Sequence, residues 1–110
     1  MKKLLVLPAA AILAMGISTA SSAADMPPLA KKSGCTACHA IDKKVVGPGW
    51  KAIADRYKGD AGAKAALIAK VKKGGKGAWT EVTKGVPMPP YSPRVNDANI
   101  EELVAFILAL

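Results

Sequence analysis

Both cysteines of the chain and its single histidine fall within residues 34–39, which read Gly-Cys-Thr-Ala-Cys-His. On one turn of helix, Cys35, Cys38 and His39 occupy positions i, i+3 and i+4, so their side chains leave from the same face. Two thiols and an imidazole on one face suit the covalent attachment of haem. Each sulfur forms a thioether with a vinyl group, and the imidazole binds the iron. Cys-x-x-Cys-His is the sequence signature of this attachment.

A Cys-x-x-Cys pair also occurs in other kinds of site. A thioredoxin-like dithiol requires a βαβ setting, and the chain has no such pattern of strands. A zinc site needs four ligands, so Asp42 or water would have to complete the set. A disulfide at this spacing would close a very short loop and would constrain little of the unfolded chain. These comparisons favour haem and leave a redox-active dithiol as the main alternative.

The N-terminal segment has the pattern of a secretory signal peptide. A basic start is followed by an apolar run from Leu4 to Ile17 and by small polar residues up to Ala23. Because the apolar run is shorter than the roughly 20 residues that span a membrane, we expect cleavage after Ala23 rather than an anchor. The chain is thereby divided into a signal peptide, residues 1–23, and one domain, residues 24–110. We expect no stable membrane association after cleavage.

The charge balance points to the kind of partner. The signal segment contains two of the 16 Lys and Arg residues, which leaves 14 against 8 Asp and Glu and a net charge of +6. A basic surface suits nucleic acid, an anionic membrane or an acidic protein. Export argues against nucleic acid, and the chain has neither a long basic run nor a platform of stacking aromatic residues. An acidic protein is therefore the preferred partner.

A second axial ligand for the haem iron has to come from a residue other than His39. Two of the four methionines precede Ala24, and Met26 lies too close to the new N-terminus to be well anchored. Met88 stands between prolines, which fix the backbone on both sides and hold the thioether without a hydrogen-bonded scaffold. We therefore predict Met88 as the ligand, the other interpretation being a hydrophobic plug.

The periodicity of apolar residues predicts an all-α fold, because no segment alternates over the length of a strand. Between the later helices, residues 74–95 form a long irregular connection, which in a small domain is usually functional. Four helices are expected, the first of them a short one from Pro27 to Ser33 that Gly34 ends. The second has one apolar face and is ended by Gly59, and the third runs from Gly62 or Ala63 to Lys73. The fourth is capped by Asn96.

The residues expected to point inward are Trp50, Ile53, Ala54 and Tyr57 in the second helix, Ala63, Leu67, Ile68 and Val71 in the third, and Ile100, Leu103, Val104 and Ile107 in the fourth.

Four motifs together resemble those of the small bacterial class I cytochromes c. They are Cys35–Asp42, Val46–Pro48, Gly77–Trp79 and Pro87–Pro90, in the order and at close to the spacing of that family. The resemblance covers nearly all of the expected domain. It implies a small cytochrome c fold, with three to five helices wrapped around one covalently attached haem c.

The resemblance also implies roles that the pattern of residues alone does not assign. Pro48 is similar to the proline whose backbone carbonyl accepts the Nδ1–H of the proximal histidine, and its simpler role is to start a helix. Trp79 is similar to the tryptophan whose indole N–H bonds a haem propionate, and its simpler role is core packing. Gly34 is similar to a small residue at which the first and last helices cross closely.

The chain departs from the family pattern around the methionine. The segment Thr80–Gly85 makes the path from Trp79 to Pro87 a few residues longer than in close relatives. Tyr91 stands where relatives often have an asparagine that bonds the methionine sulfur. Lys70 stands where some relatives have an arginine that reaches a propionate, which a lysine replaces only as a point charge.

Ligation by histidine and methionine leaves no open coordination position on the iron and raises its reduction potential, which suits electron transfer rather than catalysis. We therefore expect a monomeric periplasmic carrier, not an enzyme, that shuttles single electrons between respiratory redox proteins. The resemblance implies partners such as cytochrome complexes, a terminal oxidase or a nitrite reductase. The alternative is a haem enzyme or sensor, peroxidase-like or ligand-binding, in which Met88 leaves the iron easily.

The lysines that flank the expected haem crevice suggest a positive ring that would steer docking onto acidic patches of these partners, the simpler interpretation of any single lysine being a solvated surface. Its members are Lys31, Lys32, Lys43, Lys44, Lys72, Lys73, Lys76 and Lys84.

Overall fold

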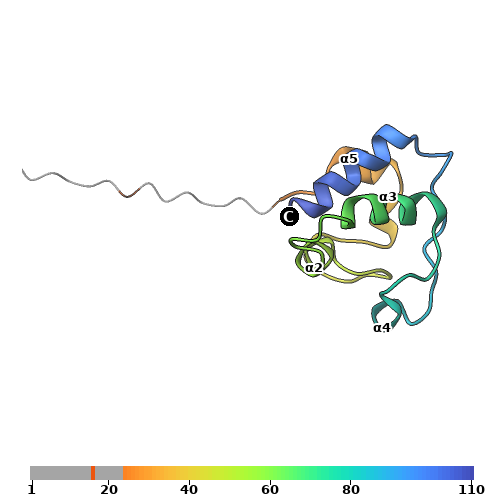
Figure 1. Ribbon diagram of the computed structural model, residues 1–110, viewed down its shortest axis with the longest axis horizontal. Helices are drawn as coiled ribbons and strands as arrows, with labels where there is room; N and C mark the ends of the chain where they lie inside the picture. The colour runs from red at the N-terminus through yellow and green to blue at the C-terminus, as the bar shows by residue number, and fades with distance from the viewer. Residues whose placement is uncertain (1–15, 17–23) are drawn as a thin grey trace, which may run out of the picture.

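The computed structural model describes residue 16 and residues 24–110. The expected signal peptide, residues 1–23, thus lies outside the described residues except for Gly16, and its cleavage remains a prediction. Within the described part there are five α-helices, one 3-10 turn and no strand, which confirms the all-α prediction (Figure 1). The elements are α1 (Pro28–Lys32), η1 (Cys35–Ala37), α2 (Trp50–Arg56), α3 (Ala63–Lys73), α4 (Thr80–Thr83) and α5 (Asp97–Leu108).

The C-terminal helix α5 organises the fold, because α1, α2 and α3 all pack against it. Figure 1 shows α3 and α5 lying side by side. The helix begins as predicted, since the Asn96 side chain accepts a hydrogen bond of 2.8 Å from the backbone N–H of Asn99. Its four predicted inward residues are all buried: Ile100, Leu103, Val104 and Ile107.

The core consists of two clusters of buried side chains, to both of which α5 contributes. Trp50 and Ile53 of α2 pack in the first cluster with Leu103 and Ile107, and Ala30 of α1 is fully buried there. The second cluster contains Tyr91, Val95, Ile100 and Val104. Leu67 of α3 packs against both clusters, so α3 contacts each of them.

The expectation for Gly34 was wrong. A Cβ atom added to this glycine would meet no other atom within 4 Å, so close helix packing does not require a glycine at this position. The backbone of Gly34 is left-handed, with φ of 86°, and it turns the chain from α1 into η1. Glycine adopts this conformation at no steric cost, which accounts for its presence here.

The connection between α3 and α5 contains a helix that the sequence analysis did not predict. Figure 1 shows the chain leaving the end of α3, reaching α4 at the edge of the molecule and returning to α5. No other helix of the described part packs against α4. No helix among the described residues is both long and apolar enough to cross a membrane.

Candidate functional site

An apolar cavity lies between α2, α3, α5 and the connection that carries α4. Its lining includes all six residues that the sequence analysis selected: Cys35, Cys38, His39, Pro48, Trp79 and Met88. Among the described residues that line it, Lys70 and Lys76 alone are charged. The cavity thus offers a largely apolar wall with sulfur and nitrogen donors from three separate parts of the chain.

The two cysteines are placed by a single tight turn. The backbone N–H groups of Cys38 and His39 both donate to the carbonyl of Cys35, at 3.2 and 2.9 Å. Both thiols are free, and Cys35 is the more buried of the two. Burial raises the pKa of the Cys35 thiol, whereas a redox-active dithiol needs a lowered thiol pKa. This environment therefore argues against the dithiol alternative.

The imidazole of His39 is fixed by two neighbours. Its Nδ1–H donates to the carbonyl oxygen of Pro48 at 2.8 Å, which leaves the Nε2 lone pair available. Burial lowers the pKa of His39 and outweighs the opposite effect of the Pro48 carbonyl, so the neutral, metal-binding form is favoured. A Cβ atom on Gly47 would lie 2.6 Å from Cε1 of this ring, so the ring rests directly on the glycine backbone.

Gly47 was not among the predicted site residues, although it lies within the Val46–Pro48 motif. The available signal was a glycine directly before Pro48. Glycine often marks a close approach to backbone, but which side chain approaches follows only from the fold.

Met88 is held by backbone hydrogen bonds, contrary to the expectation that prolines alone would fix it. Its N–H donates to the carbonyl of Gly75 at 3.1 Å, and its carbonyl accepts from the N–H of Gly75 at 2.9 Å. The N–H of Tyr91 bonds the carbonyl of Val71 at 3.1 Å, which ties the same segment to α3. Gly74 has φ of +69°, and an added Cβ atom would collide with the Met88 carbonyl. The end of α3 thus forms the scaffold for Met88.

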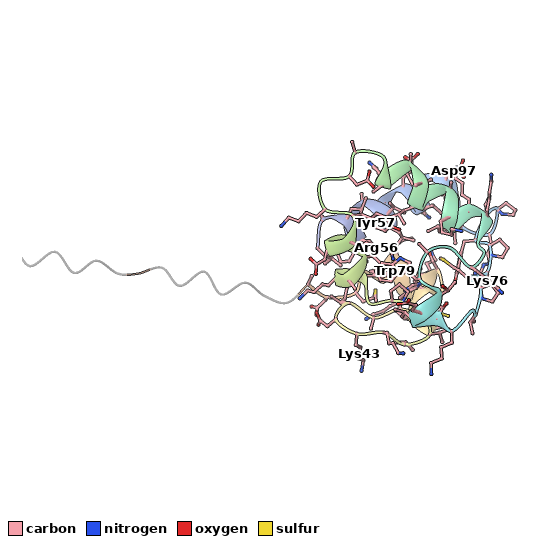
Figure 2. All side chains as sticks on the ribbon, turned by 60° about the horizontal axis from the view of Figure 1, so that its bottom comes forward. Lys43, Arg56, Tyr57, Lys76, Trp79 and Asp97 are labelled. Carbon is pink, nitrogen blue, oxygen red and sulfur yellow. The ribbon has the colours of Figure 1, made fainter. Side chains whose placement is uncertain are left out.

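Trp79 is half-buried and is contacted by an arginine that the sequence analysis missed. The Arg56 guanidinium lies 4.7 Å from the centre of the Trp79 ring and 5.8 Å from that of Tyr57. Its Nη1 also donates to the carbonyl of Ala78 at 3.3 Å. Figure 2 shows Arg56, Tyr57 and Trp79 next to one another. Nothing in the spacing of Arg56 along α2 indicates this contact.

The residues at which the chain departs from the family pattern also lie at the cavity. Tyr91 is 6% exposed and belongs to the lining, while the guanidinium of Arg94 lies 4.8 Å from the centre of its ring. Burial is the main cause that raises the pKa of Tyr91. Lys70 also lines the cavity, and its Nζ lies 3.5 Å from the carbonyl oxygen of Gly74.

The expected ring of lysines is only partly gathered at the cavity. Lys76 belongs to the lining, and Lys43 and Lys76 reach out from different edges of the molecule (Figure 2). Lys72 instead forms an ion pair of 3.2 Å with Asp97, which reduces its free charge.

The donor set fits a haem. Two free thiols, a neutral imidazole with one nitrogen already bonded, a thioether sulfur and apolar walls match the groups that hold c-type haem. Among the described residues, no three or more His, Cys, Asp and Glu side chains form a group that could hold a metal ion.

An all-α domain in which a Cys-x-x-Cys-His turn and a methionine share one apolar cavity defines a protein of the c-type haem class. The chain belongs to the cytochrome c family, whose profile matches residues 24–110. It carries covalently bound haem c and is an electron carrier rather than an enzyme.

Similar proteins are cytochromes of several bacteria. Cytochrome c-551 of Allochromatium vinosum is 49% identical over 82 residues, which are 74% of this chain and 82% of the relative. Cytochrome c-551 of Pseudomonas aeruginosa is 40% identical over 100 residues, which are 89% of this chain and 90% of the relative. The crystal structure of Nitrosomonas europaea cytochrome c552 matches with a TM-score of 0.67 at 43% identity, over 74% of this chain and 95% of that one.

Proposed function

We propose that this cytochrome c is a periplasmic carrier that shuttles single electrons between respiratory redox proteins. In this proposal Cys35 and Cys38 would hold one haem through thioether bonds, and His39 and Met88 would be the protein ligands of its iron. The observation that carries the proposal is the presence of these four side chains in the lining of one cavity. When bound, haem supplies reversible one-electron exchange between ferric and ferrous iron.

The chain's own residues orient the ligands and limit their movement. The hydrogen bond from His39 to the Pro48 carbonyl selects the tautomer in which Nε2 binds the iron. The paired backbone bonds between Gly75 and Met88 hold the thioether sulfur in a fixed segment. With Met88 as a ligand, no coordination position would stay open to oxygen or peroxide, which favours a carrier over a ligand-binding sensor. We assign Trp79 as the donor to a haem propionate, because its half-buried indole is part of the cavity wall.

The proposed partners are redox proteins with acidic docking patches. Beside the cavity the chain presents Lys76 together with two exposed valines, Val46 (40% exposed) and Val86 (50% exposed), which also belong to the lining. Transient electron-transfer interfaces are small and depend on charge for their association rates. Electron exchange with such a partner should therefore slow as ionic strength rises. A rate that does not change with salt would contradict acidic docking.

The visible spectrum of the ferric holoprotein tests the ligation. We expect the charge-transfer band of a methionine–iron bond in the wild type and in Met26→Leu, because Met26 packs against the first core cluster but does not belong to the cavity lining. Met88→Ala should lose the band and the high reduction potential while keeping covalent haem. A high-spin wild-type spectrum would refute the proposed ligation. The mass of the purified protein tests cleavage after Ala23 and covalent haem together.

A further inference from the structure

We propose that Arg56 is a positioning residue of the haem site, which clamps Trp79 and the adjoining α4 onto the end of α2. The inference deepens the proposed function and rests on it, because Trp79 is there assigned as a haem-propionate donor. Arg56 itself is exposed and does not belong to the cavity lining. It acts through Trp79, which does.

Backbone hydrogen bonds secure only one end of the connection that carries Met88. At the end nearest α3, the bonds of Gly75 with Met88 and of Val71 with Tyr91 tie both arms of the connection to the helix. At the far end stands α4, against which no other helix of the described part packs. Figure 1 shows α4 at the edge of the molecule, away from α3 and α5. The far end therefore depends on side-chain contacts for its position.

Arg56 supplies two such contacts at once, and its neighbour Tyr57 supports the same guanidinium. Its guanidinium lies 4.7 Å from the centre of the Trp79 ring, a cation–π distance, and Trp79 is the N-cap residue of α4. The Nη1 of Arg56 donates to the carbonyl of Ala78, the residue before Trp79. Tyr57 presents a second ring to the same guanidinium at 5.8 Å. One side chain of α2 thus contacts both the backbone and the ring at the start of α4.

The contact requires the shape of arginine as well as its charge. A planar guanidinium stacks on an indole and donates to a carbonyl in the same plane, whereas a lysine ammonium is a compact point charge. A clamp of this kind contributes one exposed cation–π contact and one hydrogen bond. Their loss corresponds to a roughly tenfold shift in the equilibrium for local opening of the segment.

The test uses the holoprotein and the variants Arg56→Met and Arg56→Lys. Lys58→Met is the matched control, because Lys58 is also exposed, lies two residues after Arg56 and loses the same charge. Two readouts are compared. One is hydrogen exchange of the Trp79 indole N–H, with the indole of the buried Trp50 as an internal reference. The other is the rate at which cyanide displaces the methionine ligand of ferric iron, which requires the segment that carries Met88 to open.

We expect both Arg56 variants to accelerate exchange at Trp79 and displacement by cyanide, Arg56→Met by roughly tenfold and Arg56→Lys by less. Exchange at Trp50 and the behaviour of Lys58→Met should match the wild type. The inference is overturned if Arg56→Lys equals the wild type, which would assign the effect to charge alone. It is also overturned if Trp79 exchange is unchanged in Arg56→Met, or if Trp50 accelerates equally, which would indicate a general loss of stability.

These results are separable from the proposed function. A wild-type spectrum without the methionine–iron band would refute the ligation, and exchange at the Trp79 indole would still decide the role of Arg56. A normal spectrum with unchanged indole exchange in Arg56→Met would refute the clamp and leave the proposed ligation standing.

Discussion

The substitution Gly47→Ala tests whether the His39 ring is positioned by the backbone beneath it. The added Cβ atom would lie 2.6 Å from Cε1, 3.1 Å from Nδ1 and 3.2 Å from Nε2 of the ring. Carbon atoms in contact prefer about 3.5–4.0 Å, so the ring has to retreat by roughly 1 Å. The Nδ1–H bond to the Pro48 carbonyl is now 2.8 Å, and a retreat of this size would stretch it beyond the range of a hydrogen bond.

Two costs add in this variant. Overpacking a tight site costs about 1–3 kcal/mol, and loss of one hydrogen bond adds about 1 kcal/mol. We therefore expect the free energy of unfolding of the holoprotein to fall by about 2–4 kcal/mol in urea titrations, and the iron spectrum to change with the displaced imidazole. Gly62→Ala is the matched control, because its Cβ atom would meet only Asp60 Oδ1, at an ordinary 3.5 Å. A Gly47→Ala protein with the stability of the control and an unaltered spectrum would refute this reasoning.

Three further predictions concern the scaffold. Gly74→Ala should cost about 2 kcal/mol or more and weaken the methionine–iron band, because it combines φ of +69° with a collision at Met88. Gly59→Ala is the control, because Gly59 has φ of +79° and an added Cβ atom would meet no atom within 4 Å, so this variant measures the conformational cost alone. If both variants lose the same free energy of unfolding, the collision at Met88 contributes nothing. Thr83→Val should raise the free energy of unfolding by about 1 kcal/mol, since Thr83 Oγ1 is buried without a hydrogen-bond partner. A lower free energy of unfolding would contradict this and would show that Oγ1 has a hydrogen-bond partner in the holoprotein. Apoprotein should lack a cooperative urea transition followed by circular dichroism, and a native-like transition would contradict a haem-dependent core.

The features predicted best from the sequence are those that depend on local periodicity, namely helix caps and the buried faces of helices. The N-cap at Asn96 and the inward face of α5 follow from spacing along one helix, and both are observed. The helix α4 was missed because four residues are too short to show a helical period. It lies in Thr80–Gly85, the segment that was expected to make the connection longer than in the family pattern.

Contacts between distant segments account for the rest. The resemblance to a family supplied the pairing of His39 with Pro48, which lies nine residues further along the chain. No motif marks the bond from Gly75 to Met88 or the stacking of Arg56 on Trp79, because each depends on how the chain returns to itself. Gly34 shows the opposite error. A glycine needed for a left-handed turn was interpreted as a site of close helix packing.

Several side chains of the cavity wall also belong to the core, so ligand chemistry and folding should be coupled in this protein. Trp50 and Ile53 belong to the first cluster and Tyr91 and Val104 to the second, yet all four line the cavity. The two clusters therefore face a common space in addition to packing within themselves. In a domain of this size a core is thin, so a bound apolar ring that contacts both clusters would add much of the buried surface. A substitution in this wall should consequently alter stability and iron properties together, whereas one at the exposed Lys58 should alter neither.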